Sequence, residues 1–139
     1  MTTSLAWTDD LSVGSPAIDR EHRELVELFQ RLTDPARQGD AAFLRATLDD
    51  LVRHVGEHFE REEGIMRRHG YPDYGRHRQL HGDLLDQINH FMDLMDETGA
   101  ALPPARIVDF VGNWLVGHIL RDDKALGLWL AAKHGSAAA

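Results

Sequence analysis

The sequence predicts an all-α fold: an antiparallel up-down-up-down four-helix bundle with an irregular N-terminal arm. Apolar residues recur at alternating steps of three and four in four stretches of the 139-residue chain, which is the spacing of one face of an α-helix. Short segments rich in glycine, proline and aspartate separate these stretches, and none of them alternates polar and apolar residues as a strand would. Because short loops join amphipathic helices into antiparallel neighbours, the pattern favours a bundle.

The arm is expected to span residues 1–17, with Gly14-Ser15-Pro16 as its turn and Trp7 packing back on the helices. The first helix then begins near Ile18 and ends before Pro35, because proline lacks the amide donor that a helix interior needs. Its core line reads Ile18, His22, Leu25, Phe29 and Leu32. A histidine therefore occupies one step of an otherwise apolar line.

The second helix is expected to begin after Asp40, whose side chain suits an N-cap, and to end at Gly70, which can adopt a left-handed conformation. Its core line reads Leu44, Leu48, Leu51, Val55, His58, Glu62 and Ile65. A histidine and a glutamate therefore lie among its core positions.

The third and fourth helices follow the same rule. The third begins after Asp73 and ends at Thr98-Gly99, and Pro103-Pro104 suits the start of the fourth. Their core lines read Tyr74, His77, His81, Leu84, Ile88, Phe91 and Met95, and then Ile107, Val111, Trp114 and His118. Residues 135–139 are expected to form a frayed tail, and residues 1–139 a single domain.

The composition excludes several classes of function. Fifteen Lys and Arg residues against 23 Asp and Glu residues leave a net charge of −8, which argues against a nucleic acid or an anionic membrane as partner. The chain has no cysteine, so any metal must be held by nitrogen and oxygen ligands. Neither a signal peptide nor a segment of membrane-spanning length is evident, so we expect a cytoplasmic protein without membrane insertion. No long apolar stripe lies outside the predicted core, which favours a monomer.

Polar residues on the core lines converge at one end of the predicted bundle. They are His22 early in the first helix, His58 and Glu62 late in the second, His77 and His81 early in the third, and His118 late in the fourth. Antiparallel packing places these stretches in one layer. Burying so many polar groups with few donors is costly, and a bound metal removes that cost. The layer therefore predicts a metal site.

Five imidazoles exceed the four ligands of a structural zinc ion, so two metal ions that share carboxylates fit the layer better. Glu62 is the first candidate bridge. The second is Asp122 or Asp123, and an ideal helix favours Asp122, because Asp123 is rotated about 140° away from the direction of His118. The pattern alone leaves both residues open.

These residues resemble the signature of the hemerythrin family, in its single-domain bacterial branch, the bacteriohemerythrins. The similar segments are Ile18-Asp19-Arg20-Glu21-His22, His58-Phe59-Glu60-Arg61-Glu62-Glu63, His77-Arg78-Gln79-Leu80-His81, and the run from Trp114 to Asp123. The resemblance extends from Trp7 to about Trp129, which is nearly the whole chain.

The resemblance implies two non-haem iron ions that bind O2 reversibly. One iron would be held by His77, His81 and His118 and the other by His22 and His58, while Glu62, Asp123 and a solvent-derived oxo or hydroxo group would bridge both. The second iron would keep an open position for O2. The resemblance also selects Asp123 over Asp122 as the last ligand. We therefore expect a π-bulge or local turn in the fourth helix between His118 and Asp123.

By the same resemblance, Trp114, Leu115 and Ile119 are expected to line the O2 pocket, while they also pack the core. Further polar residues lie near the implied ligands. Glu21 and Glu63 are candidates to orient an imidazole, although Glu63 is equally suited to the surface. The family usually has an aromatic residue at the position of His54, which is expected here to be exposed, a hydrogen-bond donor near the site or a spare ligand. The remaining three histidines, His69, His90 and His134, are expected to be solvated.

Two main classes of function fit this site. The favoured one is a non-enzymatic O2-binding protein for oxygen carriage, storage, supply or sensing. The alternative is a di-iron enzyme that activates O2 or reduces peroxide or nitric oxide. Four-helix di-iron enzymes use Glu-x-x-His pairs, and none falls on a core line here. A ligand set of five histidines and two carboxylates should also disfavour strongly oxidising states of iron. A nitric oxide or metal-responsive signalling module is a third possibility, but no appended domain is evident.

Overall fold

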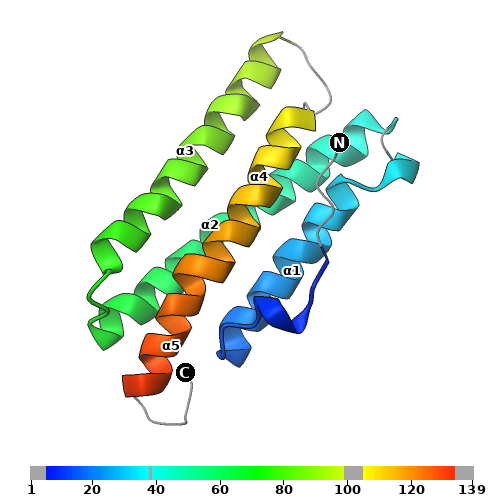
Figure 1. The fold of residues 1–139 in the computed structure, drawn as a ribbon. Helices are drawn as coiled ribbons and strands as arrows, with labels where there is room; N and C mark the ends of the chain where they lie inside the picture. The colour runs from blue at the N-terminus through cyan, green and yellow to red at the C-terminus, as the bar shows by residue number, and fades with distance from the viewer. Residues whose placement is uncertain (1–5, 38, 99–104, 134–139) are drawn as a thin grey trace.

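The computed structural model describes residues 6–37, 39–98 and 105–133. Its elements are η1 (Asp9–Leu11), α1 (Pro16–Leu32), η2 (Pro35–Arg37), α2 (Ala41–His69), α3 (Tyr74–Thr98), α4 (Ala105–His118), η3 (Ile119–Asp123) and α5 (Lys124–Lys133). The last three form one continuous rod, which is the fourth helix of an antiparallel bundle (Figure 1). No strand occurs in the described ranges, and the predicted four-helix bundle is confirmed.

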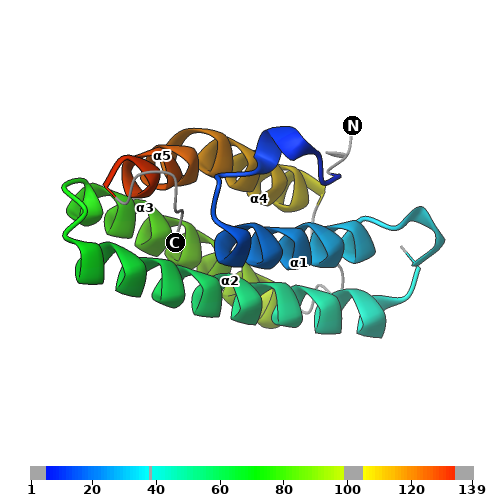
Figure 2. The ribbon, with the colours of Figure 1, turned by 90° about the horizontal axis from the view of Figure 1, so that it is seen from below.

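Helix α1 begins earlier than the sequence predicted, and the described part of the arm contains a short helical turn. The first helix begins at Pro16 rather than near Ile18, because Ser15 is its N-cap: the amide of Ile18 donates to Ser15 Oγ at 3.4 Å. Proline is favoured at the first helical position because its missing amide hydrogen would have no partner there. Preceding this helix, the arm contains the short turn η1 and lies against the α4 side of the bundle (Figure 2).

Two contacts hold the described part of the arm on the bundle. Trp7 packs against the smaller apolar cluster, as expected, and the guanidinium of Arg23 lies 4.8 Å from the centre of its ring. Close to the other end, a Cβ atom added to Gly127 of α5 would lie 1.9 Å from the carbonyl oxygen of Val13. Glycine at position 127 therefore lets the arm and α5 come into direct backbone contact.

The ends of α1 and α2 largely match the prediction. Helix α1 ends at Leu32, ahead of Pro35, and Asp40 Oδ1 accepts from the amide of Phe43 at 2.9 Å, as expected of an N-cap. Gly70 closes α2 in the left-handed conformation with φ 69°. Asp73 precedes α3, but its side chain binds Arg76 instead of a helix amide. The predicted Pro103-Pro104 start of the fourth helix and the tail at 135–139 lie outside the described residues.

Two apolar clusters fill the interior, and a polar layer lies among them. Most predicted core residues are buried; Ile65, Tyr74, Phe91 and Trp114 are half-buried at the edges. The larger cluster gathers apolar residues from α1 to α4, including Phe29, Leu48 and Leu115. The smaller cluster joins the arm to Met66, Ile119 and α5. None of the described helices is long and apolar enough to cross a membrane.

Candidate metal centre

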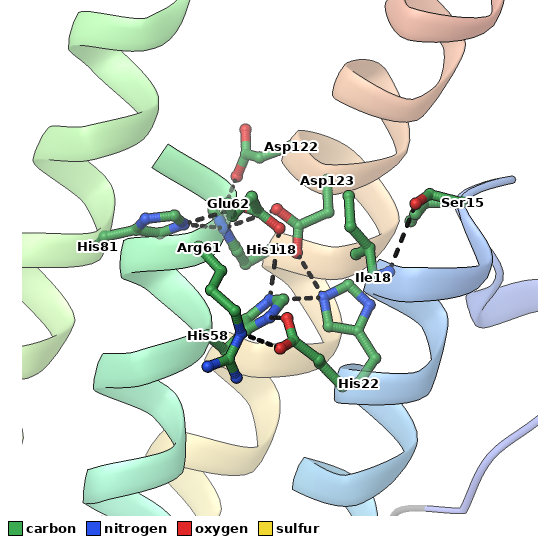
Figure 3. A network of polar contacts seen from close by, with 12 residues as sticks. Ser15, Ile18, His22, His58, Arg61, Glu62, His81, His118, Asp122 and Asp123 are labelled. Atoms are coloured by element: carbon green, nitrogen blue, oxygen red, sulfur yellow. Dashed lines mark hydrogen bonds and ion pairs between the residues drawn. The ribbon is translucent and has the colours of Figure 1, made fainter. Parts of the chain in front are cut away.

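The polar layer holds the seven residues that the sequence singled out, and each of them is at most 2 % exposed. They are His22 of α1, His58 and Glu62 of α2, His77 and His81 of α3, His118 of α4, and Asp123 of η3. Figure 3 shows several of these side chains pointing toward one another from neighbouring helices. The predicted antiparallel arrangement therefore brings all of the candidate ligands together.

The seven residues form two groups that share two carboxylates. Glu62, His77, His81, His118 and Asp123 each offer one atom within 4.8 Å of the others. A second such group consists of His22, His58, Glu62 and Asp123. Glu62 and Asp123 thus stand between a set of three histidines and a set of two. This is the arrangement that two metal ions with carboxylate bridges require.

The histidine Nε2 atoms face one another and the carboxylates at short range. His81 Nε2 and His118 Nε2 are 3.0 Å apart, and His22 Nε2 and His58 Nε2 are 3.1 Å apart. Only one proton fits between two such nitrogens, so at most one nitrogen of each pair can donate and the other must present its lone pair. His77 Nε2 lies 2.8 Å from Glu62 Oε1. The layer therefore has more acceptors than protons to satisfy them.

Some of these buried atoms lack a well-directed hydrogen bond. Both oxygens of Glu62 and the Nδ1 atoms of His22 and His77 have no partner of suitable geometry among the described residues, even though imidazole nitrogens lie close to Glu62. Leaving buried polar atoms unsatisfied is costly. A metal ion coordinated by Glu62 would satisfy its oxygens, so the residues present fit a bound metal.

A π-helical turn brings Asp123 into the layer. In an ideal α-helix Asp123 would point about 140° away from His118. The segment η3 is instead a π-helix over Ile119–Asp123, which confirms the distortion expected after His118. Asp123 Oδ1 consequently lies 3.1 Å from His118 Nε2 and 3.0 Å from His77 Nε2. The preference of ideal spacing for Asp122 was wrong, since Asp122 reaches the opposite side of the His118 ring.

The buried carboxylates remain ionised and hold protons on two of the histidines. Burial opposes protonation of His58, but its close contacts with Glu21 and Glu62 and the charges of Glu62 and Asp123 outweigh burial and raise its pKa to about 10. Burial is likewise outweighed at His77 by Asp123 and Glu62, which raise its pKa to about 9. In the metal-free layer, the negative charges of Glu62 and Asp123 are thus balanced by protons bound to His58 and His77.

The carboxylates show the opposite shift. Burial and the charge of Asp123 act to raise the pKa of Glu62, yet the contacts with three histidines lower it to about 2. Burial also acts to raise the pKa of Asp123, but the nearby histidines, above all His118, hold it well below its usual range. Both carboxylates are therefore charged at neutral pH and available to a cation.

Three further carboxylates contact the outer side of the histidine rings. Glu21 Oε1 lies 2.8 Å from His58 Nδ1, and Glu63 Oε2 lies 2.9 Å from His81 Nδ1. Asp122 Oδ2 is the third, at 3.0 Å from His118 Nδ1. Each of these contacts keeps a proton on Nδ1 and directs the Nε2 lone pair into the layer. The sequence reasoning named Glu21 and Glu63 for this role but missed Asp122, whose i, i+4 spacing from His118 was the available signal.

The expected pocket residues lie in two different clusters. Leu115 is 3 % exposed and belongs to the larger apolar cluster, as does Trp114, whose ring stacks on His118 at 4.5 Å between centres. Ile119 is equally buried but belongs to the smaller cluster. The sequence reasoning missed Phe59, whose ring stacks on that of His81 at 3.7 Å. Phe59 lies off the predicted core line, and its i, i+4 spacing from Val55 was the only hint.

The other histidines that the structure describes lie outside both groups of candidate ligands. His54 and His69 are half-buried, and His90 is exposed. His134 falls outside the described residues. None of the described three therefore extends the metal layer.

Comparison with known proteins agrees with this geometry. The model of the hemerythrin HHE cation binding domain matches residues 13–130. The bacteriohemerythrin of Methylococcus capsulatus is 32% identical over 131 residues, covering 92% of this chain and 98% of that protein. The bacteriohemerythrin of Stenotrophomonas maltophilia is 28% identical over 87% of this chain and 78% of its own length.

Solved structures show the same fold. A crystal structure of wild-type hemerythrin superposes with a TM-score of 0.81 at 28% identity, covering 91% of this chain and 97% of the other. A crystal structure of a hemerythrin point mutant gives a TM-score of 0.83, also at 28% identity, over 99% of this chain and 100% of the other. The chain belongs to the hemerythrin family.

Proposed function

We propose that this protein binds O2 reversibly at a non-haem di-iron centre in the buried polar layer. The observation that carries the proposal is the division of seven buried ligands into two groups that share Glu62 and Asp123. A single metal ion would not account for two carboxylates that belong to both ligand groups, whereas a pair of metal ions can use both carboxylates as bridges. Membership of a family whose relatives include bacteriohemerythrins and myohemerythrins supports iron as the metal and O2 as the ligand.

The ligand sets of the two irons are unequal in this proposal. His77, His81 and His118 would hold one iron through Nε2, and His22 and His58 the other, with Glu62 and Asp123 bridging. The iron held by two histidines would have one protein ligand fewer and would so offer a position to O2. When bound, the iron pair supplies the electrons that reversible O2 binding requires.

The protein's own residues would orient the ligands and keep water out. Glu21, Glu63 and Asp122 hold three of the imidazoles with Nε2 inward. Apolar and aromatic side chains cover the layer: Phe59, Trp114, Leu115 and Ile119 are at least half-buried around it. A dry, apolar surround protects bound O2 from protons and so favours its release unchanged.

We propose further that the protein is a monomeric cytoplasmic carrier, store, supplier or sensor of O2 rather than an enzyme, with residues 1–139 forming one domain. The five-histidine, two-carboxylate set supports binding over oxidation, because nitrogen-rich ligation disfavours high-valent iron. The net charge of −8 makes nucleic acid an unsuitable partner.

The test is an anaerobic reduction and re-oxygenation cycle of iron-loaded protein, followed by visible absorption. Reversible O2 binding predicts that an oxygenated spectrum appears on exposure to O2 and disappears on its removal, over several cycles. Irreversible oxidation in the first cycle, or turnover of added peroxide or nitric oxide, would favour the enzyme instead.

A further inference from the structure

Three sets of polar contacts around the metal layer have the same order of residues, from an arginine through a carboxylate to a histidine. In each, an arginine that is more than half exposed contacts a carboxylate, and the carboxylate contacts Nδ1 of a buried histidine. We call them the three triads: Arg61–Glu21–His58, Arg76–Asp122–His118 and Arg78–Glu63–His81. Each triad also joins neighbouring elements of the bundle: α2 with α1 in the first, α3 with η3 and α4 in the second, and α3 with α2 in the third.

In the first triad the arginine is hydrogen-bonded to the carboxylate. Arg61 Nε donates to Glu21 Oε2, and Glu21 Oε1 lies 2.8 Å from His58 Nδ1. Figure 3 shows the Arg61 side chain beside His58 at the edge of the layer. Burial acts to raise the pKa of Glu21, but the contacts with His58 and the charge of Arg61 outweigh burial and lower it. The carboxylate therefore stays ionised between a surface cation and a buried ring.

The other two triads differ in the strength of the outer contact. Arg76 Nη2 donates to Asp122 Oδ1 at 3.0 Å, although it also pairs with Asp73 at 2.7 Å. Arg78 Nε lies 3.9 Å from Glu63 Oε1, which is beyond hydrogen-bond distance. The coupling between arginine and carboxylate should therefore be weakest in the triad of Arg78.

An arginine in this position changes how the carboxylate acts on the histidine. A carboxylate that accepts the Nδ1 proton draws that proton toward itself and makes the imidazole a stronger electron donor to a metal at Nε2. A guanidinium bound to the same carboxylate takes up part of its negative charge and weakens this pull. Stronger donation favours the ferric state, so the arginine acts in favour of the ferrous state, which is the state that binds O2.

We propose that Arg61, Arg76 and Arg78 are positioning residues that set the reduction potential of the iron pair through Glu21, Asp122 and Glu63. The inference rests on the proposed di-iron function and adds surface residues that control it. Removal of an arginine strengthens donation by its histidine and lowers the reduction potential. The effect is largest for Arg61 and Arg76 and smallest for Arg78, in the order of their contacts with the carboxylates.

A double-mutant cycle on Arg61 and Glu21 separates this route from the plain loss of a positive charge. The midpoint potential of iron-loaded protein is measured by redox titration for the wild type, Arg61→Gln, Glu21→Gln and the double variant. We expect Arg61→Gln to raise the ferric to ferrous ratio at fixed potential by roughly threefold to tenfold, where tenfold is about 59 mV for a one-electron couple. In the Glu21→Gln background the effect of Arg61→Gln should vanish, because the carboxylate that transmits it is gone.

The measured potentials distinguish transmission through the carboxylate from a long-range effect of charge. An unchanged or raised potential in Arg61→Gln, or an equal drop with and without Glu21, would overturn the inference, since the second result is a long-range charge effect. Arg53→Gln is the matched control, because Arg53 is also on α2, 59% exposed, and paired with Asp50 of its own helix. Its potential should equal that of the wild type. If Glu21→Gln cannot be loaded with iron, the Arg76→Gln and Asp122→Asn cycle makes the same test.

Iron content and Zn²⁺ affinity, measured first, keep the two proposals apart. A wild-type protein that holds fewer than two irons contradicts the proposed function. A wild type that holds two irons and cycles with O2, but whose potential ignores Arg61, contradicts only the present inference. Competition with a chelator for Zn²⁺ should show a loss of about 10- to 100-fold in Glu21→Gln, whichever metal the cell supplies.

Discussion

The Nε2 atoms of His81 and His118 lie 3.0 Å apart in the interior, with their lone pairs facing one another. At most one proton can lie between them, and each ring has its other nitrogen engaged by a carboxylate. Two helices thus present two nitrogen ligands to one point. The Nε2 atoms of His22 and His58 also face one another, at 3.1 Å, so the layer is arranged around two points rather than one.

Replacement of a ligand should remove metal, and replacement of a nearby histidine should not. His77 is fully buried and its Nε2 lies within 3.0 Å of both shared carboxylates. His54 of α2 is half-buried and lies outside both ligand groups. We expect His77→Ala to lose at least one iron and His54→Ala to keep both, as measured by metal analysis. Retention of both irons by His77→Ala alongside loss from His54→Ala would show that the ligand assignment is wrong.

The metal-free protein should become less stable as the solution becomes alkaline. His58 and His77 have pKa values raised to about 10 and about 9, against 6.5 in the unfolded chain. The folded state therefore binds protons that the unfolded state has released, and the resulting stability is complete below pH 6.5 and lost as the pH rises through 9 to 10. Melting temperatures of chelator-treated protein from pH 6 to pH 10 test this. A constant or rising melting temperature over that range would be inconsistent with it.

Shortening Leu115 should expose the iron site to solvent. Leu115 is buried one turn before His118, in the apolar cluster that also contains Phe59. Leu115→Ala should cost about 2 to 5 kcal/mol of unfolding free energy and speed the autoxidation of oxygenated protein. Leu48→Ala in the same apolar cluster is the control, with a similar cost in stability and an unchanged rate. Stopped-flow autoxidation rates that are the same for both variants would make Leu115 an ordinary core residue.

Adding one methyl group at Gly127 should push the arm off the bundle. The new Cβ would meet the backbone oxygen of Val13 at 1.9 Å, and a backbone atom cannot rotate away as a side chain can. We expect Gly127→Ala to lower the unfolding free energy by about 1 to 3 kcal/mol. Gly82→Ala is the control on an exposed helix face, where nothing lies within 4 Å of the new Cβ. It should stabilise the protein by about 0.5 to 1 kcal/mol, and equal denaturation midpoints for the two variants would refute the close approach.

The fold and the ligand layer were predictable because both follow from helical periodicity. The positions of His22, His58, Glu62, His77, His81 and His118 on core lines, together with antiparallel order, were enough to bring them into one layer. The start of α1 was placed two residues too late, because Gly14-Ser15-Pro16 suits a turn and a capped helix start equally well. Local sequence does not separate those two outcomes.

The surroundings of the layer were less accessible to sequence reasoning. Ideal spacing pointed to Asp122, and only the resemblance to hemerythrins selected Asp123, because a π-turn changes the direction of every later side chain. Contacts such as Arg61 with Glu21 join residues 40 positions apart. Which side of an imidazole a partner reaches depends on how two helices are rotated against each other, and periodicity in one helix does not fix that rotation.

The iron content of protein purified from iron-supplied cells tests the central claim most directly. Two ligand groups that share Glu62 and Asp123 predict two iron ions per chain. The Asp123→Ala variant, which removes a residue common to both groups, should hold clearly less iron than the wild type. One iron per chain in the wild type, or zinc alone, would contradict a di-iron centre in this layer.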